Sequence, residues 1–223
     1  ALVTGGGTGI GKGIAKALSD AGAIVIITSR NKKNIDNTLK TLNDKCVGYK
    51  IDLSKSKNID TLYKNIKKKF RGVDILVNNI GHTLNIKNPF AKINDWKKVM
   101  DLNFFTTVDV TNKFILDMKK RNWGRIINIT SIAGIEISGP STFNASKAAL
   151  TAYTRSVGRQ LAVEKRNIVM TAVAPGVIPT ENGHWNKKNL NTKHAKYYLK
   201  HRTALGRFGT IDELTGIIVF LCS

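Results

Sequence analysis

The sequence predicts an α/β protein: a doubly wound parallel sheet with helices on both faces, in three layers. Two observations carry this prediction. Short runs rich in Val and Ile alternate with amphipathic stretches along the whole chain, a pattern typical of a parallel sheet wound with helices. A glycine-rich turn at residues 4–11 joins the first run to the first amphipathic stretch. Because 223 residues (24.5 kDa) suffice for one continuous core, we expect a single domain over 1–223.

The expected strands are short and mostly apolar on both faces, as strands buried within a parallel sheet are. They are residues 1–4, 24–28, 47–51, 75–78, 124–129 and 168–173. The stretches between them place apolar residues at helical spacing. We expect helices at 11–21, 32–43, 57–70, 94–120, 142–164 and 211–222. No further strand pattern follows the last helix, so we expect the closing C-terminal strand of the sheet to be missing from the chain.

One irregular stretch, about residues 178–201, interrupts the alternation. It contains Pro179, Gly183, Trp185 and a basic cluster at 186–188. Loops of this length inside a compact domain usually serve as functional covers. We therefore expect a lid over a substrate site.

The chain is strongly basic, with 36 Lys and Arg residues against 15 Asp and Glu, a net charge of +21. Such a balance can signal nucleic acid or an anionic partner. The lysines are spread along the expected helices, however, and no nucleic-acid-binding motif accompanies them. We expect no specific nucleic-acid binding.

Other function classes are disfavoured by what the sequence contains. Cys46 and Cys222 lie far apart and form no CxxC pair, and the chain has only 4 His residues, so we expect no metal site. No apolar run approaches the roughly 18–20 residues that span a bilayer, and we expect no membrane association. The chain opens on a strand-like run without a leader pattern, which favours the cytoplasm.

The glycine-rich turn carries the first functional inference. It reads Thr4-Gly5-Gly6-Gly7-Thr8-Gly9-Ile10-Gly11. Glycine permits the tight turn and lets the backbone approach a pyrophosphate without a Cβ in the way, and the N-terminus of the following helix favours the anion. A strand before the turn and a helix after it are the context that a dinucleotide-binding motif requires. We therefore expect a Rossmann-type fold that binds a nicotinamide dinucleotide.

The spacing TGxxxGxG resembles that of the short-chain dehydrogenase/reductase family, and the similarity continues along essentially the whole chain. Residues 52–53 resemble the family's adenine-contacting pair, and 78–81 its NNAG motif, with Ile80 in place of the usual Ala. Asn103, Ser131 and Lys147 match the family's relay Asn, catalytic Ser and catalytic Lys. The resemblance implies cofactor contacts at Gly5, Gly7, Thr8, Gly9, Ile10, Gly11, Ser29, Arg30, Asp52, Leu53, Asn79, Ile80, Gly81, Lys147, Pro175, Gly176, Ile178 and Thr180.

The end of the second strand predicts which dinucleotide binds. NAD-specific enzymes usually place an acidic residue there to accept bonds from the ribose 2′-hydroxyl. This chain has Ser29 and Arg30 instead. Because Arg30 would attract a 2′-phosphate and Ser29 could donate to it, we expect NADPH rather than NADH.

The sequence departs from the resembled family at one decisive position. The family's YxxxK pattern supplies a proton-donating Tyr four residues before the Lys, on the same helix face. This chain has Phe143 at that place, four residues before Lys147. Three interpretations stay open: an engineered Tyr→Phe change, an enzyme that uses another acid such as His82, or a catalytically silent dinucleotide-binding subunit. The first two imply a carbonyl reductase or alcohol dehydrogenase.

The substrate is weakly determined by the sequence. Candidate pocket residues are His82, Ile135, His184 and Trp185. The basic lid suits a polar or anionic carbonyl compound. Arg121 and Arg166 lie near positions where acyl-carrier-protein reductases of the resembled family have basic residues, which leaves an acyl thioester and a sugar-type carbonyl both open. The resemblance also implies a homotetramer or homodimer built on the helices at 94–120 and 142–164.

Overall fold

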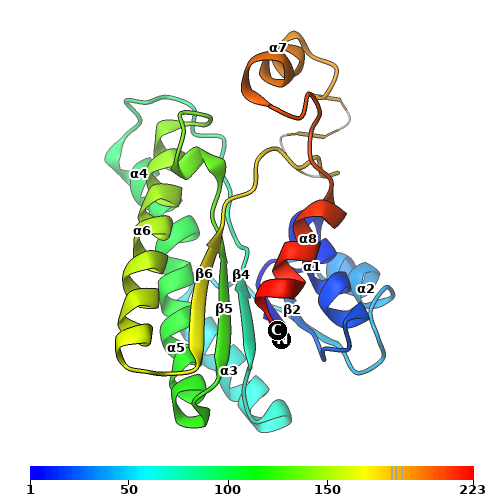
Figure 1. Cartoon of the computed structure of the whole chain (residues 1–223), viewed down its shortest axis with the longest axis vertical. Helices are drawn as coiled ribbons and strands as arrows, with labels where there is room; N and C mark the ends of the chain where they lie inside the picture. Colours follow the sequence, from blue (N-terminus) through cyan, green and yellow to red (C-terminus); the bar gives the residue numbers. More distant parts are fainter. Residues whose placement is uncertain (182, 184, 187) are drawn as a thin grey trace.

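The chain forms a six-stranded parallel sheet in the order β3-β2-β1-β4-β5-β6 (Figure 1). This computed structural model describes residues 1–181, 183, 185–186 and 188–223. The strands are β1 (Leu2–Val3), β2 (Ile26–Ser29), β3 (Val47–Lys50), β4 (Ile75–Asn78), β5 (Gly124–Ile129) and β6 (Ile168–Val173). The winding direction reverses between β1 and β4, which creates a crevice at the carboxyl ends of these strands. The predicted α/β fold class is confirmed.

Helices cover both faces of the sheet. They are α1 (Gly9–Asp20), α2 (Lys32–Leu39), α3 (Ser56–Phe70), α4 (Ile93–Met100), α5 (Thr106–Arg121), α6 (Ser141–Val163), α7 (Lys193–Arg202) and α8 (Ile211–Leu221). In Figure 1, α3, α5 and α6 lie on one side of the strands and α1, α2 and α8 on the other. The helix α7 lies apart from both layers, at the top of the view.

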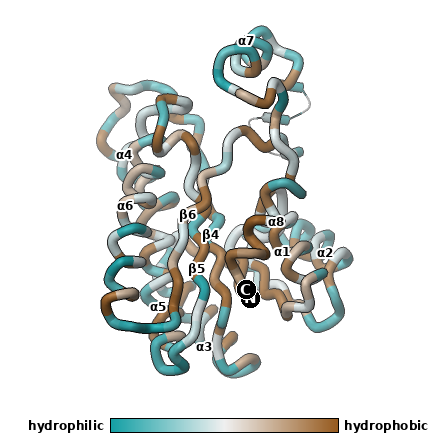
Figure 2. Tube along the Cα trace, viewed as in Figure 1, coloured by the Kyte–Doolittle hydropathy of each residue, from teal (hydrophilic) through white to brown (hydrophobic). Residues whose placement is uncertain are grey.

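Two apolar cores follow from the alternation of side chains along each strand. On β1, Leu2 joins the core shared with α3, α5 and α6, whereas its neighbour Val3 joins the core shared with α1, α2 and α8. Both residues are fully buried. Figure 2 shows the apolar colour running along the strands, while the outer turns and much of α7 are hydrophilic. The sheet is therefore fixed from both sides, and its carboxyl edge is a rigid support.

The predicted strands agree with the structure, and 75–78, 124–129 and 168–173 have the predicted ends. The predicted helix at 94–120 is interrupted by a π-helical segment, η1 (Asp101–Phe105). There the side-chain amide of Asn103 donates to the carbonyl oxygen of Val99 at 2.8 Å, an oxygen that a regular α-helix would pair with a backbone N–H. The predicted helix at 32–43 ends at Leu39, after which the chain continues in i→i−3 turns.

The lid region contains a helix that the sequence analysis did not identify. This helix, α7, is capped by the Thr192 hydroxyl, which accepts from the backbone N–H of Ala195 at 3.2 Å. Only Ala195 and Tyr198 among its residues are buried, so it lacks the apolar stripe by which a helix is recognised in sequence. Among the described residues, no helix is long and apolar enough to cross a membrane.

Candidate active site

A cleft of about 610 Å³ lies at the carboxyl ends of the strands. Its walls come from the segments that follow all of the strands, together with the start of α6 and part of η1. In open α/β sheets, ligands bind in this crevice at the point where the winding reverses. The topology alone therefore brings the sequence-predicted residues of distant segments to one place.

The glycine-rich turn forms the floor of one half of the cleft. Gly5 and Gly9 have φ of 65° and 55°, a left-handed conformation that side chains disfavour. A Cβ on Gly11 would collide with the carbonyl oxygen of Gly5 and lie 2.5 Å from Nδ2 of Asn79. Helix α1 begins at Gly9, and the side chain of its N-cap Thr8 makes no capping bond. The first amides of the helix are thus available to an anion.

Asn79 fixes the turn against β4. Its backbone N–H donates to the Thr4 hydroxyl at 2.9 Å, and its side-chain amide donates to the Thr4 carbonyl oxygen at 3.1 Å. The Thr28 hydroxyl accepts from the Gly5 N–H at 3.3 Å. The end of β1 is therefore held on both sides, which keeps the phosphate cradle in its shape before a ligand arrives.

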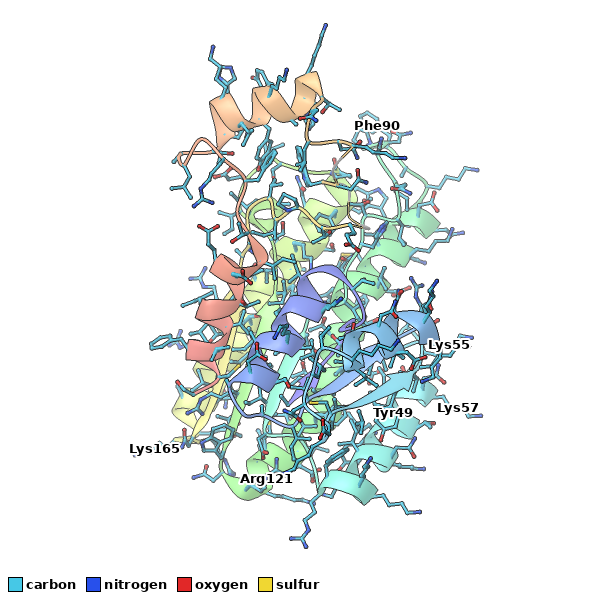
Figure 3. The ribbon with its side chains drawn as sticks, turned by 90° about the vertical axis from the view of Figure 1, so that its right-hand side faces the viewer. Tyr49, Lys55, Lys57, Phe90, Arg121 and Lys165 are labelled. Carbon is cyan, nitrogen blue, oxygen red and sulfur yellow. The ribbon has the colours of Figure 1, made fainter. Side chains whose placement is uncertain are left out.

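The far end of the cleft offers one carboxylate and one cation. Burial opposes the ionisation of Asp52, but hydrogen bonds from Ser54 and the cations Arg30 and Lys55 outweigh it, so the pKa of Asp52 is lowered. Ser54 donates to Asp52 from its backbone N–H (3.1 Å) and its hydroxyl (2.8 Å). Arg30 is exposed at the end of β2, and Lys55 and Lys57 project from the surface near each other (Figure 3). This end of the cleft can therefore accept hydrogen bonds at the Asp52 carboxylate and attract an anion at Arg30.

The opposite end of the cleft contains Phe143 and Lys147, one helical turn apart on α6. Lys147 is only 3% exposed, and its Nζ donates to the carbonyl oxygen of Ile129 at 2.9 Å. The Nζ lies 5.7 Å from the centroid of the Phe143 ring. Burial lowers the pKa of Lys147 to about 8. A buried ammonium with a pKa so close to neutrality is typical of functional sites.

Ser131 follows β5 and faces the same end of the cleft. Its hydroxyl oxygen accepts from the Ala133 N–H at 3.1 Å and caps the short 3₁₀ turn η2 (Ile132–Gly134). The backbone N–H of Ile132 donates to the carbonyl oxygen of Pro175 at 3.0 Å, which joins the loops after β5 and β6. The hydroxyl proton of Ser131 is not used by that cap, so it can be directed toward a substrate oxygen.

Asn103 lies behind the cleft wall and is fully buried. Its side chain accepts from the backbone N–H of His82 at 3.0 Å and donates to the backbone oxygen of His82 at 2.9 Å. A Cβ on Gly81 would lie 2.8 Å from Oδ1 of Asn103. Asn103 therefore anchors the backbone at His82. The relay role that the resemblance implies for it stays a prediction.

The structure brings most of the predicted cofactor residues together. Of the predicted site, the cleft is lined by Gly5, Thr8, Gly9, Ile10, Gly11, Ser29, Arg30, Asp52, Leu53, Asn79, Ile80, Gly81, His82, Ser131, Phe143, Lys147, Pro175, Gly176 and Thr180. Gly7 packs beside Ser29 behind the turn, and Ile178 lies against Gly209. Thr180 lies over the turn, 3.4 Å from where a Cβ on Gly9 would be.

The structure does not bring all of the predicted substrate residues that it describes to the cleft. Ile135 is 71% exposed and does not line the cleft. Trp185 lies in an aromatic cluster of the lid, with ring centroids 5.5 Å from His194, 5.3 Å from Tyr198 and 5.2 Å from Phe208. His184 falls outside the described residues. Of the three that the structure describes, His82 lines the cleft, and its Nδ1 accepts from the Leu84 N–H at 2.8 Å.

Several lining residues were not predicted. They are Thr28, Asn31, Asn34, Ile51, Ser54, Leu102, Ile129, Thr130 and Gly183. Position at the end of an expected strand was an available signal for Thr28, Ile51 and Ile129, because the carboxyl ends of parallel strands meet at one edge. For Asn31 the available signal was its residue type, because Asn is favoured immediately before a helix. In the structure Asn31 caps α2 by accepting from the amides of Lys33 and Asn34.

Comparisons with known proteins agree with this geometry. Residues 1–191 match the sequence model of the family described as short chain dehydrogenase. The chain is 34% identical to a 3-oxoacyl-[acyl-carrier-protein] reductase of Aquifex aeolicus, covering 100% of this chain and 89% of that protein. It is 32% identical to the reductase of the same name from Haemophilus influenzae, covering 100% and 90%. A solved short chain dehydrogenase from Bacillus anthracis superposes with a TM-score of 0.87 at 26% identity, covering 100% and 88%.

Proposed function

The chain belongs to the short chain dehydrogenase family of NAD(P)-dependent oxidoreductases acting on C=O and CH–OH groups, and on this premise we propose that it is an NADPH-dependent carbonyl reductase. The observation that carries the proposal is the meeting of the glycine turn, Ser131 and Lys147 in one cleft. Its substrate is a polar or anionic carbonyl compound.

The residues of the cleft fit a dinucleotide from end to end. The free amides at the start of α1 would hold the pyrophosphate, the carboxylate of Asp52 would accept from the adenosine, and Arg30 would pair with a 2′-phosphate. Asn79 to Gly81 and Lys147 would hold the nicotinamide riboside. When bound, the dinucleotide supplies a hydride to the substrate carbon. The fit rests on the space that the missing Cβ of Gly11 leaves at the turn.

The chain's own side chains would handle the substrate oxygen. The Ser131 hydroxyl orients the carbonyl by donating to it, and the Lys147 ammonium makes the site positive where negative charge develops on the oxygen. Phe143 closes the pocket beside Lys147 but has no proton to give. This last point favours the second candidate function, a silent dinucleotide-binding subunit, and it makes the proton source the question that decides between them.

The substrate class is narrowed by the lid and by the relatives. Cations on and before α7 (Lys188, Lys193, Lys196, Lys200 and Arg202) favour an anionic compound. The relatives are 3-oxoacyl-[acyl-carrier-protein] reductases, which favours an acyl thioester over a sugar-type carbonyl. Assembly as a homotetramer or homodimer is supported by exposed apolar side chains on η1, α5 and α6: Phe105, Leu116 and Val163.

The proposed function is tested by titrating the chain with NADPH and NADH and by assaying NADPH oxidation with a panel of 3-oxoacyl thioesters and sugar-type ketones. We expect NADPH to bind more tightly than NADH, and slow oxidation with the acyl thioesters. A chain that binds neither dinucleotide would refute the proposal.

Replacing Arg30 with Ala is expected to weaken NADPH binding selectively. A hydrogen-bonded ion pair with a phosphate contributes about 1.5–3 kcal/mol, and since Arg30 is exposed we take the lower end, a rise of about tenfold in the Kd of NADPH. The Kd of NADH should change little. Fluorescence titration of both dinucleotides measures this, with Lys57→Ala as a matched control for loss of one exposed cation. An equal change for both dinucleotides would contradict the assignment of Arg30.

A further inference from the structure

Apolar side chains project into solvent from the segments that border the cleft. Phe90, between β4 and α4, is 91% exposed, and Ile137, after η2, is 86% exposed. These are the two most exposed large apolar side chains among the described residues. Together with five others from the same segments, the start of α4, and α7 and its end, they form a set that we call the rim: Leu84, Phe90, Ile93, Ile135, Ile137, Tyr197 and Leu205.

The rim lies at one end of the molecule. In Figure 1 the segment between β4 and α4, the turn between η2 and α6, and helix α7 all lie beyond the carboxyl ends of the strands. Figure 3 shows Phe90 near the same end as α7. Arg202, at the end of α7, donates to the carbonyl oxygen of Ile137 at 3.5 Å. Because the chain before each rim segment also lines the cleft, at His82, Ser131 and Thr180, the rim borders the cleft entrance.

The segments that carry the rim are far more basic than the rest of the chain. Residues 84–93, 135–137 and 188–205 contain one acid, Glu136, whereas the whole chain has 15 acids against 36 Lys and Arg residues. Among the described residues, no ion pair involves any of these segments. Their exposed cations are Lys87, Lys92, Lys188, Lys193, Lys196, Lys200 and Arg202. The partner of the rim should therefore be both anionic and apolar.

An anionic lipid surface fits this combination better than another protein does. The rim side chains come from separate segments (Figure 1), whereas a specific protein interface needs a continuous complementary surface of about 800 Å² on each partner. A second copy of the chain would bring the same cations together. A bilayer admits separate apolar side chains at the boundary between its headgroups and acyl chains, and its anionic lipids attract lysines to the surface.

We propose that the rim docks this chain on a membrane surface that contains anionic lipids. Phe90 and Ile137 insert beside the lipid headgroups, and Lys196 and its neighbouring cations contact the phosphates. The cleft entrance then faces the bilayer, from which, on the proposed function, a lipid-soluble carbonyl compound can enter. The expectation of no membrane association rested on the absence of a spanning run, and surface docking needs no such run.

The test is flotation of the full chain with vesicles of phosphatidylglycerol and phosphatidylcholine in equal parts. We expect binding, and binding at least about tenfold weaker to vesicles of phosphatidylcholine alone. Phe90→Ser and Ile137→Ser should each lower the partition constant about tenfold or more, because each removes a large apolar side chain from the contact. Lys196→Glu should lower it by a similar factor, because about fivefold is lost for each unit of charge. A native chain that does not float would overturn the proposal.

Matched controls lie at the opposite end of the molecule. Phe220, 70% exposed near the end of α8, lies toward the C-terminus that Figure 1 marks beside the N-terminus. Lys68 is exposed in the last turn of α3. Phe220→Ser and Lys68→Glu should leave the partition constant nearly unchanged. Because the whole chain carries +21, equal losses in Lys68→Glu and Lys196→Glu would mean unspecific attraction and would overturn the proposal.

A second readout reports which end meets the lipid. An environment-sensitive dye attached to the thiol of Phe90→Cys should shift its emission to the blue when anionic vesicles are added. The same dye on Phe220→Cys should show no shift. The native thiols, Cys46 and Cys222, are buried, so the introduced thiol reacts first. Equal shifts at both positions, or a shift at the control position alone, would contradict docking through the rim.

Other occupants of the rim are distinct outcomes. If the native chain ignores vesicles but is held on a poly-glutamate matrix, and Lys196→Glu releases it, the partner is an acidic protein and the proposal is wrong. If it ignores vesicles and self-associates in sedimentation velocity, and Phe90→Ser ends that association, the occupant is a second copy and the proposal is again wrong. The vesicle tests need no dinucleotide. Loss of docking with intact NADPH binding therefore overturns this inference alone, and absence of NADPH binding refutes the proposed function alone.

Discussion

Replacing Phe143 with Tyr should raise NADPH-dependent carbonyl reduction by about 10²–10⁴-fold, the usual contribution of a positioned general acid. The phenyl ring already lies on the same helix face as Lys147, with the ammonium 5.7 Å from the ring centroid. The positive charge of the ammonium beside the ring would lower the pKa of a phenol at this position. The change adds the missing proton without altering the shape of the pocket, so the gain should appear in kcat.

Two matched variants separate this effect from a general change in packing. Phe143→Leu removes the ring without adding a hydroxyl and should give no gain. Ser131→Ala in the Phe143→Tyr background should remove most of the gain, because the carbonyl would lose its orienting donor. Steady-state oxidation of NADPH with the acyl thioester panel measures all of them. If Phe143→Tyr binds NADPH but turns over none of these substrates, the silent-subunit interpretation is favoured.

The parts of the site that the sequence predicts well are those set by local rules. A strand, a left-handed glycine and a helix start are specified within residues 1–20, so the glycine turn could be placed without knowledge of the rest. Its bond to Asn79, 75 residues away, could not be placed by such local rules. Residues at the ends of parallel strands are similarly predictable, because the pattern that identifies a strand also places its carboxyl end at the cleft.

The parts that it predicts poorly depend on tertiary contacts. The π-helical segment arises because the Asn103 side chain forms hydrogen bonds with both Val99 and the distant backbone of His82. The spacing of apolar residues in the sequence does not reveal these bonds. Trp185 is a comparable case: its predicted place in the pocket stays a prediction, and its packing against His194, Tyr198 and Phe208 is a tertiary cluster that sequence spacing does not show. The low pKa of Lys147 depends on burial, which composition does not show.

Replacing Gly11 with Ala should weaken the binding of NADPH and NADH alike, by about 100-fold. A Cβ at this position would meet the Gly5 carbonyl oxygen and, at 2.5 Å, the Asn79 amide nitrogen. Both neighbours belong to the turn and to the residue that braces it, so neither can move without opening the phosphate cradle. Overpacking costs about 1–3 kcal/mol, and each lost bond to a charged phosphate about 1.5–3 kcal/mol. Together these energies correspond to a loss of this size.

The control for Gly11→Ala is Gly216→Ala in α8, where a Cβ would meet nothing within 4 Å. Ala in a helix interior is favoured over Gly by about 0.5–1 kcal/mol, so Gly216→Ala should raise Tm slightly and leave both Kd values as they are. Circular dichroism establishes that each variant is folded, and fluorescence titration gives the Kd. The equal loss for both dinucleotides distinguishes the cradle from Arg30, whose removal should affect NADPH alone. A folded Gly11→Ala protein that binds NADPH within about threefold of the native Kd, less than 1 kcal/mol, would show that the phosphates lie elsewhere.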